Sequence, residues 1–223
     1  MHFLVVALGL AMTALGASAA QAQATFFTVT YVEVSPKATR PATALLKSYV
    51  AAGKKDDGNV SLELLKGIHR PAWFTVVGAW KDQKAYEAHA ATAHTKSMNE
   101  KIQEHVAAPN DTRQHSGLAV TAAKSGKAGV CAVTHVDSIP PQRENGTAAV
   151  KQLAEDSRKH EGNLRFDVLV QTNRPNHFTV VECWKDRKAF DAHVAAKEAK
   201  DFRNKLVAMT GALYDERLYK AVD

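Results

Sequence analysis

Two Trp–His pairs stand at matched places in the sequence. His89 follows Trp80 by nine residues, and His193 follows Trp184 by the same nine. An imidazole takes up and returns protons near neutral pH, because its unperturbed pKa is about 6.5. An indole offers a flat apolar surface to an aromatic ring. The pattern therefore predicts two sites that could hold a small aromatic molecule and move a proton.

These pairs belong to a repeat of the whole chain. Residues 74–89 and 178–193 are identical at 11 of 16 positions and lie 104 residues apart. Composition alone would give roughly one identity over such a stretch. We therefore predict two copies of one domain, residues 25–120 and 129–223, joined by a small polar linker at 121–128.

Each copy predicts the element order β-α-β-β-α-β. The first strand runs over 26–33 and 130–137, a period-two strand follows over 60–64 and 164–170, and the third strand ends at the Trp. Asp82 and Asp186 are natural N-caps of the second helix, and the last strands lie near 115–120 and 216–222. This order is typical of the ferredoxin-like unit, so the fold class is α+β with two tandem repeats.

The sheets of the two repeats are expected to pack against each other. Helices cover one face of each sheet, and an uncovered apolar second face would be a large exposed patch. We therefore expect the two sheets to meet face to face as an intramolecular α+β barrel, a pseudo-dimer within one chain. Whether this unit oligomerises further is left open.

The second helix turns each His toward the sheet. At 3.6 residues per turn, His89 shares a face with Tyr86, and His193 shares one with Phe190. For a Trp alone, core packing is the favoured interpretation, and a lone helix His is usually a half-buried residue with a polar partner. Recurrence of both at one spacing favours a functional site, although shared packing demands would also preserve them.

The repeated pattern resembles a known family. F-T-V-V-x-x-W-K-D-x-x-A-[YF]-x-A-H, after G-N-x-x-x-x-x-L, is similar to the antibiotic biosynthesis monooxygenase domain of the dimeric α+β barrel superfamily. The first copy also has the frequent H-x(4)-H step from His89 to His94, where the second copy has Glu198. The second copy has the frequent acidic residue two before the Trp, Glu182, where the first has Gly78.

The resemblance implies an oxygenase that needs no metal or flavin. A phenol or hydroquinone is deprotonated, its anion passes an electron to O₂, and the radical pair recombines to give a quinone. His89 and His193 would transfer the proton, with Trp80 and Trp184 as apolar walls. Further substrate-binding candidates are Tyr31, His135, His94, Glu182, Tyr86 and Phe190.

The function predicted first is therefore an exported, cofactor-independent monooxygenase that turns a small phenolic or hydroquinone substrate and O₂ into a quinone. The alternative is a barrel that binds a small aromatic ligand without turnover, or a stress-associated structural barrel. The family's haem-degrading branch fits poorly, because its iron-ligating His would fall near Asn99 and Arg203.

Other classes of chemistry find no support in the sequence. The ten histidines form no HExxH-type motif, and there is no Gly-rich phosphate loop, so we expect no metal and no cofactor. The net charge is +6, but acidic and basic residues alternate without a basic block. This pattern argues against nucleic-acid binding.

The N-terminal residues have the features of a signal peptide. An apolar run over 3–15 is followed by Ala22-Gln23-Ala24, so we expect a signal peptide at 1–24, with cleavage after Ala20 as an alternative. The mature chain would then be periplasmic or secreted and would keep no stable membrane anchor. Cys131 and Cys183 lie in apolar strands, and free buried thiols are favoured over a disulfide.

Overall fold

The computed structural model describes residues 25–222, so the expected signal peptide at 1–24 lies outside the described residues. The elements of the first repeat are β1 (Phe26–Glu33), η1 (Pro36–Ala38), α2 (Thr39–Gly53), β2 (Asn59–Gly67), β3 (Trp73–Trp80), α3 (Gln83–Ala91), α4 (Ala93–Ile102) and β4 (Asp111–Ala119). Those of the second are β5 (Val130–Asp137), η2 (Pro140–Gln142), α5 (Arg143–Ser157), β6 (Asn163–Gln171), β7 (His177–Trp184), α6 (Arg187–Ala195), α7 (Lys197–Val207) and β8 (Asp215–Val222).

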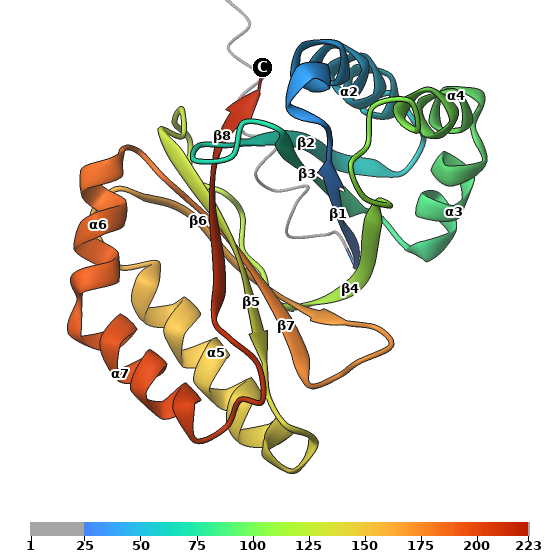
Figure 1. Ribbon diagram of the computed structural model, residues 1–223. Coiled ribbons are helices and arrows are strands. Elements are labelled where there is room, and N and C mark those ends of the chain that lie inside the picture. The colour runs from blue at the N-terminus through green and yellow to red at the C-terminus, as the bar shows by residue number, and fades with distance from the viewer. Residues whose placement is uncertain (1–24, 223) are drawn as a thin grey trace, which may run out of the picture.

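The eight strands close into one barrel in the order β1-β3-β2-β8-β5-β7-β6-β4. Antiparallel pairing of β2 with β8 and of β4 with β6 joins the two repeats. Closure leaves no unpaired sheet edge. Helices α2, α3 and α4 lie on one side of the barrel, and α5, α6 and α7 lie on the opposite side (Figure 1). The predicted α+β fold of two ferredoxin-like repeats packed sheet to sheet is thus confirmed.

Three hydrophobic cores hold this arrangement together. One lies between helices and sheet in the first repeat, around Leu46 and Trp80, and one lies in the same place in the second, around Val150 and Trp184. The third fills the barrel interior, where residues of both repeats meet. Each strand therefore has one face toward helices and one toward the barrel interior, and this decides which side chains can share a site.

The second helix of each repeat is broken, which the sequence did not predict. In the first repeat the break falls at Thr92, which is extended (φ −65°, ψ 155°) and whose hydroxyl oxygen accepts from the Thr95 backbone N–H at 3.3 Å. Ala196 of the second repeat is extended in the same way (φ −62°, ψ 152°) without a side-chain cap, so the Thr92 hydroxyl caps α4 but does not by itself cause the break. The break starts a new helix just before His94.

The two cysteines form a disulfide. Cys131 on β5 and Cys183 on β7 are direct partners in the antiparallel register, and their sulfur atoms are 2.02 Å apart. The preference for free thiols was therefore wrong. Strand register, which the sequence spacing of 52 residues does not reveal, brings the pair within bonding distance.

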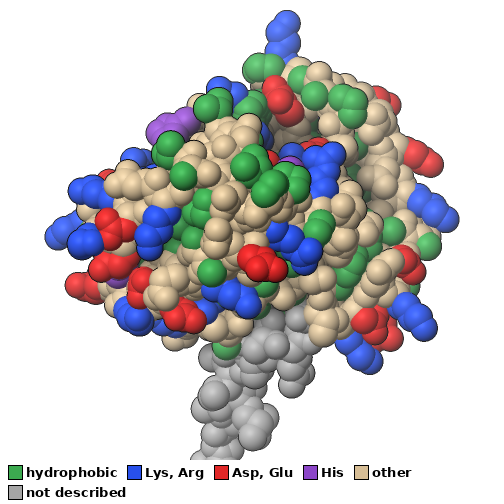
Figure 2. All heavy atoms as spheres, turned by 90° about the horizontal axis from the view of Figure 1, so that it is seen from below, with side chains coloured by type: hydrophobic (Ala, Val, Ile, Leu, Met, Phe, Trp, Pro, Cys, Tyr) green, Lys and Arg blue, Asp and Glu red, His purple; other side chains and the backbone are tan. Residues whose placement is uncertain are grey.

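The surface has no single-sign field in the view of Figure 2, where Lys and Arg side chains lie among Asp and Glu side chains. Within residues 25–222, no helix has the length and apolar character needed to cross a membrane.

Candidate active site in the first repeat

His89 lies buried between α3 and the sheet. The Asp82 carboxylate caps α3 by accepting the Ala85 backbone N–H at 2.8 Å, which fixes where the helix begins. His89 then faces inward and is 2% exposed. Its ring lies against the indole of Trp80, with 4.5 Å between ring centroids. On the other side, a Cβ on Gly53 would come within 2.9 Å of the His89 ring, so the end of α2 requires glycine there.

Both ring nitrogens of His89 have partners. Nδ1 lies 2.6 Å from Asp56 Oδ2, and Nε2 lies 2.7 Å from the Tyr49 hydroxyl. A carboxylate accepts but does not donate, so the proton belongs on Nδ1 and Nε2 is the acceptor. Burial lowers the pKa of His89, and the hydrogen bond to Asp56 opposes that shift. The result is a neutral imidazole whose basic nitrogen faces Tyr49.

A cavity of about 100 Å³ opens beside Tyr49 and His89. Its lining is partly apolar and partly polar: Thr28, Thr30, Val32, Leu46, Tyr49, Leu62, Val76, Tyr86, His89, Ala90, Thr95, Met98, Asn99, Asn110 and Thr112. Asn99 and Thr112 are exposed and mark the side that faces solvent. The Asn110 Oδ1 atom is buried and has no hydrogen-bond partner among the described residues. It is therefore an acceptor available to a hydroxyl in the cavity.

Trp80 has a different place from the predicted wall. It is fully buried, its indole N–H donates to the Thr28 hydroxyl at 3.2 Å, and it packs beneath His89 without lining the cavity. Tyr86, one of the substrate-binding candidates, lines the cavity. His94 lies on α4. Its Nε2 atom is 3.0 Å from Asp56 Oδ2, the same oxygen that contacts His89 Nδ1.

The second repeat keeps the Trp–His stack but changes its partners. The rings of Trp184 and His193 are 4.7 Å apart, and the Trp184 indole N–H donates to Glu182 Oε2 at 2.7 Å. His193 Nδ1 faces His160 Nδ1 at 3.1 Å. Burial raises the pKa of Glu182 to about 8 and lowers that of His193 to about 4. Both groups are therefore neutral at pH 7.

Larger side chains fill the second repeat where the first has its cavity. Matching positions of the two repeats lie 104 residues apart. At these positions the second repeat has Phe166 in place of Leu62, Phe202 in place of Met98 and Tyr214 in place of Asn110. Phe166 and Phe202 are buried in the same core cluster as Trp184 and Phe190. Leu153 replaces Tyr49 and His160 replaces Asp56, so the Asp–His–Tyr chain is missing as well.

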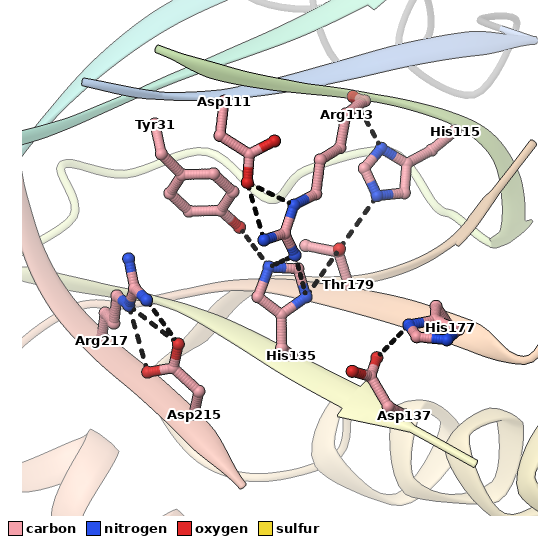
Figure 3. A network of polar contacts seen from close by, with 10 residues as sticks. All are labelled: Tyr31, Asp111, Arg113, His115, His135, Asp137, His177, Thr179, Asp215 and Arg217. Atoms are coloured by element: carbon pink, nitrogen blue, oxygen red, sulfur yellow. Dashed lines mark hydrogen bonds and ion pairs between the residues drawn. The ribbon is translucent and has the colours of Figure 1, made fainter. Parts of the chain in front are cut away.

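Tyr31 and His135 do not belong to either Trp–His site. Tyr31 shares the barrel-interior face of β1 with Phe27 and Val29, whereas Thr28 and Val32 face the cavity. Its hydroxyl lies 2.9 Å from His135 Nε2, which Arg113 also contacts (Figure 3). The expectation that Tyr31 and His135 line the substrate pocket is therefore wrong. Side chains alternate between the two faces of β1, and Tyr31 is on the face that points into the barrel interior. Burial lowers the pKa of His135 to about 4 and that of His115 to about 3, so the network is built on neutral imidazoles.

Asp56, Tyr49 and Asn110 were missing from the predicted site. Tyr49 lies on α2, and no pattern in the sequence marked it as a site residue. Asp56 lies in the loop after that helix, 33 residues before His89, and Asn110 comes just before β4. No motif in the sequence links this loop to His89.

Fold and site together define an intramolecular dimeric α+β barrel with a histidine in a helix–sheet cavity. The model of the family described as "Antibiotic biosynthesis monooxygenase" matches residues 25–101 and 130–205, most of the chain. The chain belongs to this family, in two tandem copies.

Individual relatives agree with this placement. Over 54 residues the chain is 33% identical to "Putative monooxygenase YcnE" of Bacillus subtilis (strain 168), which covers 24% of this chain and 57% of that protein. The chain thus spans little more than half the length of that curated relative.

Solved structures share the whole two-repeat architecture. A "putative monooxygenase" of Fusobacterium nucleatum has a TM-score of 0.77 at 17% identity, over 90% of this chain and 93% of its own. An "anthrone oxidase-like protein" has a TM-score of 0.70 at 12% identity, over 91% and 93%. At these identities the likeness shows the fold alone.

Proposed function

We propose that this chain is an exported monooxygenase that oxidises a small phenol or hydroquinone with O₂, without a cofactor, in the cavity of the first repeat. The observation that carries the proposal is the hydrogen-bonded chain from Asp56 through His89 to Tyr49 at the cavity wall. The second repeat acts as the structural partner that closes the barrel.

The proton path follows from the hydrogen bonds. Burial raises the pKa of Tyr49, so its hydroxyl keeps its proton and donates to His89 Nε2. A substrate hydroxyl that bonds to the Tyr49 oxygen would pass its proton to Tyr49 as the Tyr49 proton moves to His89. Asp56 then stabilises the imidazolium, and a second hydroxyl of the substrate could donate to Asn110 Oδ1.

The rest of the reaction is the substrate's own chemistry. The phenolate gives one electron to O₂, and the phenoxyl radical and superoxide combine at a ring carbon. Loss of water from the peroxide leaves a carbonyl, so a hydroquinone and O₂ give a hydroxyquinone and H₂O. The protein supplies the base, orientation and a water-poor pocket.

The size of the cavity limits the substrate. An engineered apolar cavity of roughly 150 Å³ holds benzene, and this one is smaller, about 100 Å³. We therefore expect a side chain of the lining to move when a ring enters. Tyr86 lines the cavity and is only half-buried, so it is the side chain we expect to swing out.

Export is proposed on two grounds. The apolar run before Ala22-Gln23-Ala24 fits a signal peptide. The Cys131–Cys183 disulfide supports an oxidising compartment such as the periplasm.

Oxygen uptake tests the proposal. The mature chain, treated with chelator, is given hydroquinones and anthrone-like phenols, and uptake is compared with product formed. One O₂ per product is expected, above the substrate's own autoxidation. The double variant Leu62→Phe with Met98→Phe places the phenylalanines of the second repeat at the matching positions of the first. It should fill the cavity and abolish oxygen uptake while the chain still folds. Unchanged uptake in that variant contradicts the assignment to this cavity.

A binding protein without turnover is the second candidate, favoured by the small volume of the cavity. It predicts that a phenol binds the wild-type chain, that Leu62→Phe with Met98→Phe blocks binding, and that no product forms during prolonged aerobic incubation.

A further inference from the structure

Near the cavity, three side chains bring atoms that could bind a metal ion close together. They are Asp56 Oδ2 from the loop after α2, His89 Nδ1 from α3 and His94 Nε2 from α4. All three atoms lie within 4.8 Å of one another, and Asp56 Oδ2 is 2.6 Å from His89 Nδ1 and 3.0 Å from His94 Nε2. Three separate elements thus supply two imidazoles and one carboxylate at one point.

This set of donors suits a divalent first-row transition ion. Zn²⁺ takes imidazole nitrogen and carboxylate oxygen at about 2.0–2.2 Å, which places neighbouring ligand atoms about 3–3.5 Å apart. To reach that spacing the 2.6 Å contact of Asp56 with His89 would open by about 0.4–0.9 Å, and the 3.0 Å contact with His94 by at most about 0.5 Å. The side chains of Asp56 and His94 are 18% and 28% exposed, so an ion can reach them from solvent.

The surroundings of His89 also fit a metal ligand. A histidine that binds a metal through one nitrogen usually donates its other N–H to a fixed partner, which sets the ring orientation. Here the Tyr49 hydroxyl lies 2.7 Å from His89 Nε2 and can accept that bond. Packing against Trp80 and Gly53 holds the ring in place.

We propose that Asp56, His89 and His94 form a binding site for a divalent ion of the Zn²⁺ class, and that the bound ion inhibits the chain. An ion on Nδ1 moves the ring proton of His89 to Nε2, which then donates to Tyr49 and can no longer accept a proton. The inhibitory effect rests on the proposed oxygenase function, whereas ion binding does not.

The second repeat provides an internal control of the same composition. The matching positions hold His160, His193 and Glu198, again two imidazoles and one carboxylate. There the two Nδ1 atoms face each other at 3.1 Å, and Glu198 lies 3.8 Å from the opposite nitrogen, Nε2, of His160. The three groups do not converge on one point, so only the first repeat is expected to bind the ion.

Calorimetric titration of the metal-free mature chain with ZnCl₂ tests the site. We expect one ion per chain, at least about 100-fold weaker binding after His94→Gln, and a change of less than about twofold after His160→Gln. Asp56→Asn is the second test variant, and circular dichroism checks that each variant is folded. No saturable binding, or equal losses from His94→Gln and His160→Gln, would overturn the proposal.

A second arm separates this proposal from the oxygenase function. Zn²⁺ should suppress oxygen uptake by the wild-type chain, with recovery on adding chelator. If the chain binds Zn²⁺ at this site but consumes no oxygen, the metal site is supported and the oxygenase function is contradicted. A chain that consumes oxygen but does not bind Zn²⁺ contradicts the site alone.

Discussion

The Asp56 carboxylate decides which nitrogen of His89 carries the proton. Asp56→Asn keeps the side-chain shape but offers an amide that can donate to Nδ1 and turn the ring to the wrong tautomer. We expect kcat for oxygen uptake to fall by about 10²–10⁴. His160→Asn, at the matching position of the second repeat, is the control and should change kcat by less than about twofold. Equal effects of the two substitutions would contradict the role given to Asp56.

Glu182 makes a prediction about stability and pH. Its pKa of about 8 in the folded chain lies above the ordinary 4.5, so the wild-type chain loses stability as pH rises from 4.5 through 8. Glu182→Gln still accepts the Trp184 N–H but does not ionise. The stability of the variant relative to wild type should therefore grow between pH 5 and pH 8, by about 3–4 kcal/mol. Urea unfolding at both pH values measures it, and a pH-independent difference would refute the neutral carboxyl.

Among single residues, the sequence predicted best where a side chain's neighbours are local. His89 and Tyr86 were placed correctly because helix periodicity fixes their shared face. Tyr31 was assigned to the wrong face because β1 is apolar on both sides, so alternation gave no direction. Asp56 was missed because its contact with His89 depends on how the loop after α2 folds back.

At the scale of elements, the disulfide fastens β5 to β7. Constraining a chain segment in the unfolded state usually stabilises a fold by about 2–4 kcal/mol. Replacement of both Cys131 and Cys183 by Ser should lower the free energy of unfolding by that amount and make stability insensitive to reductant. The measurement is thermal and urea unfolding with and without dithiothreitol. An equal effect of reductant on wild type and variant would show that the bridge contributes nothing.

The order of elements was predictable, but two details were not. Repetition and period-two patterns give β-α-β-β-α-β, whereas the break of the second helix falls at Thr92 in one repeat and at uncapped Ala196 in the other, so no capping residue announces it. The pairing of Cys131 with Cys183 depends on strand register. Such features depend on tertiary contacts, which cannot be predicted from the periodicity of the sequence.

At the scale of the whole molecule, Arg165 connects the two repeats inside the barrel. Its guanidinium is buried, with Nε 2.6 Å from Asp167 Oδ2 and Nη1 3.1 Å from Glu63 Oε1 of the other repeat. Removing one partner of a buried pair typically costs about 3–5 kcal/mol, so Arg165→Met, which takes this partner from buried Asp167 of the same strand, should destabilise the chain by that much in urea unfolding. Glu63→Gln removes only the charge pair between the repeats and should cost under about 1 kcal/mol, because Glu63 is partly exposed. A loss for Arg165→Met no larger than that for Glu63→Gln would contradict the weight given to the buried pair within β6.

The two repeats differ in their interiors within one barrel. Closure of the barrel needs both, because β2–β8 and β4–β6 pairing joins them. The cavity and the Asp–His–Tyr chain are in the first repeat, and a filled core stands at the matching place in the second. The sequence showed that the copies differ at these positions but not which difference opens or fills a cavity.

Oxygen consumption by His89→Gln and His193→Gln, side by side, tests this difference between the repeats most directly. The mature chain and both variants are given the best phenolic substrate in the presence of chelator. We expect His89→Gln to reduce uptake to the rate of autoxidation, whereas His193→Gln retains most of the wild-type rate. Equal loss in both variants, or full activity in His89→Gln, would contradict it.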